Sequence, residues 1–233
     1  MYTWLAGQLD QAFDPPQLLK ETSRGSVSLL RHKTTGKRFI LRRTSGQAVV
    51  YRKLLGVTCP HLPAILEVAT EGDRSLILEE YVQGDNMGEL LQGALFTSEE
   101  TRRIGVQLCR ALWVLHSLGV VHRDVKPENV ILRGQDAVLI DFDAARLYRP
   151  DSTADTQVLG TMGFAAPEQY GLSQSDHRAD IYAMGVLLNV MLTGEHPSRR
   201  MAPGRWGRIV SRCTQVTPEK RYQTMLQLSK AIT

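Results

Sequence analysis

The sequence has few cysteines and no long apolar run, and both absences narrow the class of protein. The 233 residues include Cys59, Cys109 and Cys213, whose spacing fits neither a disulfide framework nor a zinc site. No window approaches about 18 uninterrupted apolar residues, so we expect no membrane-spanning helix and no membrane partner. The N-terminal stretch MYTWLAGQLDQAF has no basic start and a broken apolar run, which argues against a signal peptide. We therefore expect a cytoplasmic protein.

Acidic residues are absent between Glu21 and Glu67, where lysines and arginines accumulate. This basic stretch could dock an acidic partner, although a solvated strand face is the simpler interpretation. The formal net charge of the chain is +4. A charge of this size favours nucleic acid binding only when it is clustered on one face, so we expect a mildly basic enzyme with no nucleic acid partner.

Hydrophobic content is 42% and charged content 22%, as in ordinary globular proteins. Residues 26–43 read as two strands joined at TTGK, and residues 64–82 as a hairpin turning at EGD. After Gly93 the pattern becomes helical: Thr97 and Glu100 form a capping-box pair, and DIYAMGVLLNVMLTG is apolar nearly all round. The segment NVILRGQDAVLIDF between these helices reads as a short hairpin. The pattern predicts an α+β fold, with a small β-rich lobe followed by a larger helical lobe.

Five blocks in the second part of the chain carry a family resemblance. They are VVHRDVKPENVIL at 120–132, IDFDAAR at 140–146, GFAAPEQYG at 163–171, DIYAMGVLL at 180–188 and TPEKRYQT at 217–224. In this order and at this spacing they resemble the catalytic loop, the metal-binding segment and the Ala-Pro-Glu segment of protein kinases, and two structural blocks beyond them. The chain looks most similar to bacterial, eukaryotic-like Ser/Thr kinases. The resemblance implies one bilobal kinase-like domain over residues 1–233, with an upper lobe and hinge at about 1–82 and a lower lobe at 83–233.

The resemblance assigns chemistry to four residues of these blocks. Asp124 would accept the proton of the substrate hydroxyl, and Lys126 would steady the moving phosphoryl group. Asn129 and Asp141 would hold magnesium, a hard cation that prefers oxygen ligands. ATP and Mg²⁺ are the implied cofactors, and a protein with a Ser or Thr acceptor is the implied substrate.

Other matched positions are structural in the family. Glu168 and Arg221 resemble the partners of a buried ion pair, and Asp180 resembles the helix aspartate that braces the catalytic loop. We interpret His122 as a packing and hydrogen-bonding residue.

The upper lobe departs from the family pattern. Gly25 and Val27 align with the last glycine and the valine of the glycine-rich loop, but Lys20 and Thr22 stand at the first two glycine positions and Arg24 at the loop tip. Glycine matters there because the backbone must approach the phosphates closely.

The strand lysine and the helix glutamate are also missing. Arg42 stands fifteen residues after Val27, where the lysine is usual, and an arginine is not equivalent to a lysine at a tight phosphate site. A one-residue slip would select Arg43 instead. The helix glutamate is absent because the stretch has no acid, and Gln47 or a neighbour takes its position.

LILEEYV at 76–82 resembles the hinge, where Glu80 and Val82 would offer backbone groups to adenine, and Ile131 is the matching nucleotide contact in the lower lobe. Glu79 falls at the gatekeeper position, where a buried carboxylate needs a partner. We hypothesise that Glu79 pairs with Arg42 in place of the missing glutamate. The alternative is that Glu79 faces solvent or another basic residue.

The segment from Asp141 to Glu168 carries further differences and further signals. Asp143 stands where glycine is usual, so a second carboxylate lies close to the metal position. Thr161 resembles the threonine of the substrate-docking loop, which favours Ser or Thr as acceptor. Phosphorylation of Thr153 or Thr156, with Arg123 receiving the phosphate, is a hypothesis.

Three functions stay open from the sequence. The first is an active Ser/Thr protein kinase, supported by Asp124, Lys126, Asn129 and Asp141. The second is a pseudokinase that acts as a binding or scaffold module, supported by Arg42, the missing helix glutamate and the poor glycine loop. The third is a kinase fold that acts on a small molecule or transfers another part of the nucleotide, which the Ala-Pro-Glu and GTMGF segments argue against.

Overall fold

The computed structural model describes residues 2–22, 25–46, 48–148, 161, 163–170 and 175–233. The chain divides into two compact units. The first comprises residues 1–59 and 63–82, and the second comprises residues 60–62 and 83–233. The first unit is built on a sheet and the second is mainly helical, so the α+β class expected from the sequence is confirmed. No helix in the described ranges is long and apolar enough to cross a membrane.

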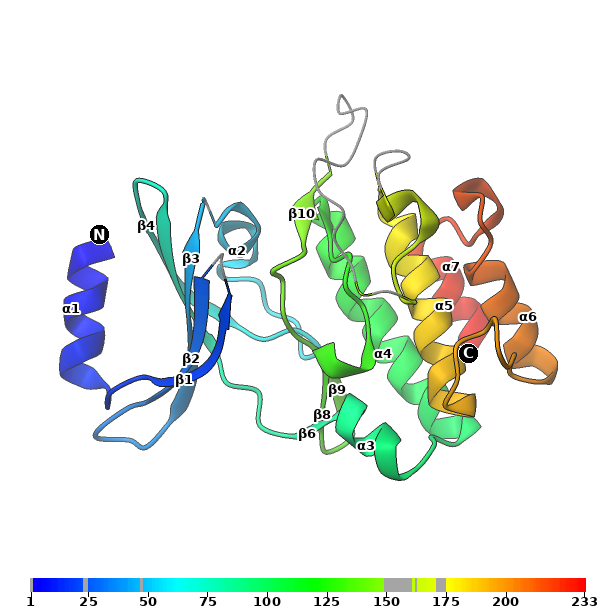
Figure 1. The fold of residues 1–233 in the computed structure, drawn as a ribbon, viewed down its shortest axis with the longest axis horizontal. Helices are drawn as coiled ribbons and strands as arrows, with labels where there is room; N and C mark the ends of the chain where they lie inside the picture. The colour runs from blue at the N-terminus through cyan, green and yellow to red at the C-terminus, as the bar shows by residue number, and fades with distance from the viewer. Residues whose placement is uncertain (1, 23–24, 47, 149–160, 162, 171–174) are drawn as a thin grey trace. The chain divides into compact units, whose positions relative to one another are not determined.

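The first unit contains a five-stranded antiparallel sheet in the order β1-β2-β3-β5-β4 (Figure 1). Its elements are α1 (Tyr2–Ala12), β1 (Gln17–Thr22), β2 (Gly25–Arg31), β3 (Arg38–Ser45), α2 (Val49–Leu54), β4 (Ile65–Glu71) and β5 (Arg74–Glu80). The two hairpins read from the sequence are therefore confirmed. Successive side chains along β3 point to opposite faces of the sheet, and its apolar residues Phe39, Ile40 and Leu41 are consecutive. Leu41 is buried on one face and Arg42 on the other.

An N-terminal helix, which the sequence reading did not predict, covers one face of this sheet. Leu5 and Leu9 of α1 join Leu41 and Leu76 of the sheet in one buried cluster. Figure 1 shows α1 lying alongside β4, and the two elements pack together. The helix was missed because its apolar pattern is weak and half of its residues stay exposed.

The second unit contains four main helices that pack side by side (Figure 1). They are α4 (Ser98–Ser117), α5 (Arg178–Thr193), α6 (Gly204–Cys213) and α7 (Met225–Ile232), preceded by the short α3 (Met87–Gly93). The core helix α5 is buried nearly all round, as its sequence predicted, and it ends at Gly194, whose φ of 73° a glycine adopts without strain. Helix α4 packs against α5 and α7, and α6 packs against α5.

The capping box predicted at the start of α4 is present. Thr97 Oγ1 accepts a hydrogen bond from the Glu100 amide at 3.2 Å, and the Thr97 amide donates to Glu100 Oε2 at 2.8 Å. These bonds satisfy amides at the helix start that have no partner within the helix.

Short strands and single helical turns lie in the connections between these helices. They are β6 (Asp85–Asn86), β7 (Val120–Val121), β8 (Val130–Arg133), β9 (Asp136–Leu139) and β10 (Arg146–Leu147), with single turns η1 (Pro127–Asn129), η2 (Pro167–Tyr170) and η3 (Pro218–Lys220). The predicted hairpin corresponds to β8 and β9, which pair antiparallel. The hairpin ends at the pair Val130 and Leu139, next to the candidate site residues Asn129 and Asp141.

Candidate functional site

The loop that carries Asp124 is held by hydrogen bonds to the side chain of Asp180 in α5. This aspartate is fully buried, and its two oxygens accept the amides of His122 at 2.9 Å and of Arg123 at 2.7 Å. Arg123 has a φ of 69°, an uncommon conformation for a non-glycine residue that persists only where the surroundings enforce it. The bracing role expected for Asp180 is confirmed by this geometry.

Both oxygens of Asp124 are engaged in hydrogen bonds. Oδ1 accepts the hydroxyl of Thr161 at 2.7 Å, and Oδ2 lies 2.8 Å from Lys126 Nζ and 3.0 Å from Asn129 Nδ2. Burial alone would raise the pKa of Asp124, but the hydrogen bonds from Lys126, Thr161 and Asn129 outweigh it, so the pKa is held below its usual value. Asp124 is therefore a carboxylate at neutral pH and can accept a proton.

Lys126 connects this carboxylate to the segment that ends at Glu168. Its Nζ donates to Thr161 Oγ1 at 2.6 Å, and Thr161 in turn donates to Asp124. The three side chains form a closed polar triangle, although they are separated by up to 37 positions in the sequence. The resulting site holds one negative and one positive group at fixed positions.

Asn129 and Asp141 come together at the open end of the β8–β9 hairpin. Val130 pairs with Leu139, and the ladder continues with the Ile140 amide donating to Asn129 O at 2.9 Å. The amide nitrogen of Asn129 donates to Asp124 O at 2.8 Å, which leaves its Oδ1 as the atom that can ligate a cation. Asp141 has a φ of 68°, a second strained backbone position beside the site. Asp143 lies next to it and donates its amide to Asp141 Oδ1 at 3.2 Å.

These two oxygen donors fit Mg²⁺. This ion is commonly held by one or two carboxylate or carbonyl oxygens of the protein together with substrate phosphates. No cluster of three or more His, Cys, Asp or Glu side chains suited to a metal occurs in the described part of the chain.

Three further side chains support the loop. His122 is fully buried with its ring edge against Phe142, and burial lowers its pKa, so it is neutral at neutral pH and acts in packing. His116 of α4 lies 2.8 Å from Asp180 Oδ2, and Gln169 donates to Arg123 O at 2.9 Å. Neither His116 nor Gln169 has a recognisable signal in the sequence, because their partners come close only when the helices pack.

In the first unit, Gly25 opens β2 directly opposite Thr22 of β1, so β1 and β2 form a tight hairpin. A side chain at Gly25 would collide with the carbonyl oxygen of Arg43, and its φ is +151°. Val27 is half-buried and pairs with Arg42 across β2 and β3. Arg24, at the expected loop tip, lies outside the described residues.

Arg42 and Glu79 form the ion pair that the sequence suggested. The Nε atom of Arg42 lies 2.9 Å from Glu79 Oε1, and their side chains are 8% and 5% exposed. The antiparallel register places Ile40 opposite Glu79 and Arg42 opposite Ile77, so the two charged residues are diagonal neighbours on one face. The alternative in which Glu79 faces solvent is wrong.

The short helix α2 contributes an aromatic ring to this pair. The guanidinium carbon of Arg42 lies 5.9 Å from the ring centroid of Tyr51, a distance at the limit of a cation–π contact. Helix α2 contains no acidic residue. Gln47, the candidate for the missing helix glutamate, lies outside the described residues. Tyr51 has no recognisable signal in the sequence, since a helix of 6 residues has too few turns for a periodic pattern.

The remaining nucleotide candidates lie on separate elements. Glu80 ends β5, and its amide donates to Ala64 O at 2.9 Å, so this N–H is committed within the unit. Val82 follows the strand and is buried. Ile131 is half-buried in β8 of the second unit, paired with Val138.

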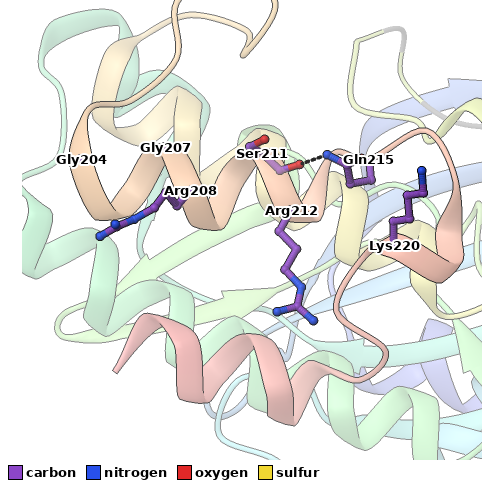
Figure 2. A pocket seen from close by; sticks show the side chains of 7 residues that line it. All are labelled: Gly204, Gly207, Arg208, Ser211, Arg212, Gln215 and Lys220. Atoms are coloured by element: carbon purple, nitrogen blue, oxygen red, sulfur yellow. Dashed lines mark hydrogen bonds between the residues drawn. The ribbon is translucent and has the colours of Figure 1, made fainter.

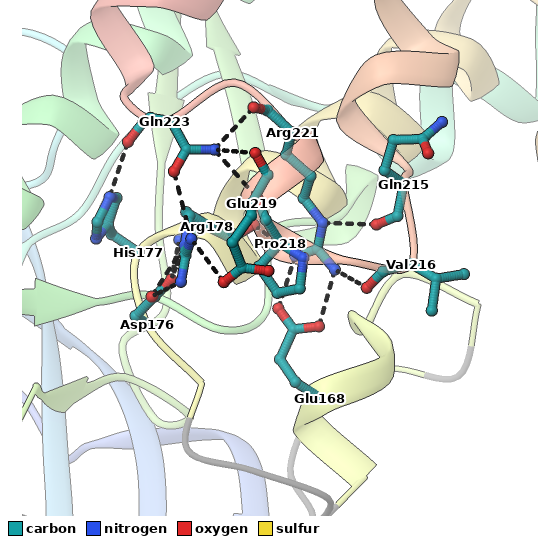
Figure 3. A network of polar contacts seen from close by, with 10 residues as sticks. All are labelled: Glu168, Asp176, His177, Arg178, Gln215, Val216, Pro218, Glu219, Arg221 and Gln223. Atoms are coloured by element: carbon teal, nitrogen blue, oxygen red, sulfur yellow. Dashed lines mark hydrogen bonds and ion pairs between the residues drawn. The ribbon is translucent and has the colours of Figure 1, made fainter.

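Arg221 and Glu168 form the buried pair expected from the sequence. Arg221 Nη1 lies 2.6 Å from Glu168 Oε1, and its Nη2 lies 2.8 Å from Oε2, a bidentate geometry that arginine favours (Figure 3). The guanidinium also donates to the carbonyl oxygens of Arg178 and Gln215. This pair ties η2, at the end of the Thr161 segment, to the start of α5 and to the loop after α6.

The first unit is built on a sheet and has the buried Arg42 on its third strand, and the second unit is helical and holds the Asp124 loop on Asp180. This two-unit α+β architecture is that of protein kinases. Comparison with known families agrees, because the protein kinase domain matches residues 23–232. The chain belongs to the protein kinase family.

The curated proteins that the chain resembles include bacterial proteins named as Ser/Thr kinases. The chain is 31% identical over 182 residues to a protein of Clostridium perfringens named as a probable serine/threonine-protein kinase, covering 76% of this chain and 26% of that protein. It is 31% identical over 180 residues to the serine/threonine-protein kinase pkn2 of Myxococcus xanthus, covering 74% and 21%. It is 30% identical over 209 residues to the serine/threonine-protein kinase PknD of Mycobacterium tuberculosis, covering 82% and 32%. The chain thus spans a third or less of these relatives.

Proposed function

We propose that the chain is an ATP-dependent Ser/Thr protein kinase that transfers a phosphoryl group from Mg-ATP to a protein hydroxyl in the cytoplasm. The observation that carries this proposal is the ionised carboxylate of Asp124, which is held by hydrogen bonds from Lys126, Asn129 and Thr161. Catalysis of phosphoryl transfer depends mainly on positioning the reacting groups and on stabilising the charge of the transferred group, and this arrangement supplies groups for both.

In the proposed reaction, Asp124 orients the acceptor hydroxyl and takes its proton. Lys126, held 2.8 Å from Asp124, offers its positive charge to the transferred group. Mg²⁺, when bound, supplies charge neutralisation at the phosphates, and the chain offers Asn129 Oδ1 and the Asp141 carboxylate as its ligands.

Nucleotide binding is proposed for the first unit together with Ile131. Gly25 and Val27 would line the phosphates and the base, Glu80 and Val82 would offer backbone groups to adenine, and Arg42 would contact a phosphate. Glu79 would hold Arg42 in the pose for this contact. Arginine presents a planar fork where a lysine presents a point charge, so the phosphate geometry of this site would differ from the common one.

Thr161 supports a Ser or Thr acceptor in a protein. Its hydroxyl joins Asp124 to Lys126, and it belongs to a segment that resembles the peptide-docking elements of Ser/Thr kinases. Phosphorylation at Thr153 or Thr156 stays a hypothesis, and both residues lie outside the described residues.

A pseudokinase is the second candidate, and specific observations favour it. Arg42 replaces the strand lysine, and helix α2 brings Tyr51 and no acid to it. A chain of this kind would bind partners and transfer phosphate poorly or not at all. Retention of Asp124, Lys126, Asn129 and Asp141 argues against it, because a scaffold has no physical need of all four.

Nucleotide binding followed by transfer tests the proposal. We expect ATP with magnesium to raise the thermal unfolding midpoint of the wild type, and Asp141→Asn to lose this shift. Transfer to a generic Ser/Thr protein substrate should then be lost in Asp124→Asn, which keeps the side chain's shape. A magnesium-dependent shift without transfer would favour the pseudokinase. Transfer to small hydroxyl compounds but not to proteins would change the proposed substrate from a protein to a small molecule.

A further inference from the structure

Positive charge is concentrated at the end of the chain. After Glu195 the sequence contains eight lysines and arginines and a single acid, Glu219, whereas the whole chain has a net charge of only +4. The rest of the chain is therefore slightly acidic. An asymmetry of this size creates a local positive potential that attracts anionic partners.

Helix α6 presents part of this charge on one face. Its apolar residues Ile209, Val210 and Cys213 are buried, and a side chain at Gly185 of α5 would collide with Cys213. Arg205, Arg208 and Arg212 are exposed, at spacings of three and four residues that place them along one stripe of the helix. Arg205 donates to Ala231 O at 2.8 Å and so holds the end of α7. Arg208 and Arg212 are left for another role.

A hollow of about 470 Å³ lies along this helix. Its lining consists of Gly204, Gly207, Arg208, Ser211, Arg212, Gln215 and Lys220 (Figure 2). Three of these residues are cationic and none is acidic. Gly204 is exposed at one end of the hollow, whereas Gly207 is buried where a side chain would collide with the carbonyl oxygen of Ala202.

Two of the three cationic side chains of the hollow have no polar partner in the part of the chain that the structure describes. Among the described residues, the side chains of Arg208 and Lys220 have no hydrogen bond and no ion pair. Arg212 stacks on the ring of Tyr222, with its guanidinium carbon 4.4 Å from the centroid, which orients the group without cancelling its charge. The neighbouring Glu219 pairs with Arg178 at 3.2 Å (Figure 3).

The wall of the hollow is rigidly held. Gln215 Nε2 donates to Ser211 O at 2.9 Å, and the buried Arg221 donates to Gln215 O at 2.8 Å. Arg221 is itself fixed by Glu168 (Figure 3). The loop backbone beside the hollow is therefore held in place, and a ligand has only the exposed side chains of Arg208 and Lys220 to order.

We propose that this hollow is a docking site for an acidic segment of a partner protein. In Figure 2 the side chains of Arg208, Arg212 and Lys220 point in separate directions, so they do not converge on a single small anion. Their spread matches carboxylates distributed along a peptide. The described residues that line the hollow include no Trp, Tyr or Phe, the rings on which single-stranded nucleic acid stacks. The docking site is separate from phosphoryl transfer and does not depend on it.

The test is binding of a fluorescein-labelled, Glu-rich peptide, measured by fluorescence anisotropy on the full chain at low and at physiological ionic strength. The variant R208E/R212E/K220E reverses the three charges of the hollow. A matched control, K37E/R102E/R110E, reverses three other exposed charges and has the same net charge. We expect the hollow variant to weaken binding about tenfold or more, and the control to stay within about twofold of the wild type. Equal thermal unfolding midpoints of the two variants exclude misfolding.

Several outcomes would overturn the proposal. Equal losses in both variants mean that the peptide responds to net charge alone. Equal binding of a peptide with Gln in place of Glu removes the role of charge. Tighter binding of a DNA strand of equal charge assigns the surface to nucleic acid, and tighter binding of anionic lipid vesicles assigns it to a membrane surface.

Discussion

The guanidinium of Arg42 and the carboxylate of Glu79 lie 2.9 Å apart on neighbouring strands, and both side chains are buried. The register of β3 and β5 fixes them as diagonal neighbours, so the backbone ladder maintains the pair. A carboxylate supplied by a strand keeps this cation in place regardless of the position of helix α2. The pair therefore offers no obvious way to be switched by a helix movement.

The energetic coupling of this pair can be measured with a double-mutant cycle. Removing one partner leaves a buried charge that has lost its counter-ion, so we expect Glu79→Leu or Arg42→Met to lower the free energy of unfolding by about 3–5 kcal/mol. The double variant should lose less than the sum of the two, because it buries no isolated charge. Urea denaturation of the four proteins gives these values. Strictly additive losses would mean that the contact contributes no coupling energy.

The hydroxyl of Thr161 is expected to matter for turnover. Thr161→Val removes the bond to Asp124 at 2.7 Å and that from Lys126 at 2.6 Å but keeps the shape of the side chain. Loss of one positioning contact at the proposed catalytic carboxylate should lower kcat by about tenfold to a hundredfold. Thr161→Ser keeps the hydroxyl and serves as control. An unchanged kcat in Thr161→Val, measured with saturating nucleotide, would contradict a positioning role.

The Arg221–Glu168 pair is expected to dominate the stability of the second unit. Arg221→Lys keeps the charge but loses the fork that binds both oxygens of Glu168 and the nearby carbonyls, so unfolding should become easier by about 3 kcal/mol or more. The exposed Arg212→Lys is the matched control and should change the free energy of unfolding by less than about 1 kcal/mol. Similar urea midpoints for the two variants would argue against this assignment.

Stability should fall below neutral pH because His122 is buried in its neutral form. Burial lowers its pKa from the ordinary 6.5, although the carboxylates of Asp180, Asp124 and Asp141 oppose this effect. Below about pH 6.5 the unfolded chain binds a proton at this position that the folded chain does not, so the free energy of unfolding decreases as pH falls. Asp124 and Asp180, whose pKa values are lowered, stay ionised in this window.

The His122 contribution is at most about 1.4 kcal/mol per pH unit. We expect His122→Phe, which cannot titrate, to show a shallower decline between pH 7.5 and 5.5 in thermal unfolding. Equal slopes for the variant and the wild type would assign the decline to other histidines, such as His61, whose pKa burial also lowers.

Much of the fold could be predicted because its local signals are strong. The strand runs joined at TTGK and EGD, the Thr97–Glu100 capping box and Gly194 at the end of an apolar helix are each signals that span only a few residues. The helix α1 could not be predicted, since it forms only by burying Leu5 and Leu9 against a sheet whose strands come later in the chain.

The candidate site divides in the same way. The sequence by itself determined which chemical groups are present: Asp124, Lys126, Asn129 and Asp141 at their spacing, and an upper sheet with an arginine and no nearby acid. Only the tertiary structure decided that Glu79 supplies the counter-ion of Arg42, because strand register selects which side chains share a face. It also decided that Lys220, Arg208 and Arg212 line one hollow, since the loop that carries Lys220 is anchored through the neighbouring Arg221 to Glu168, which is distant in the sequence.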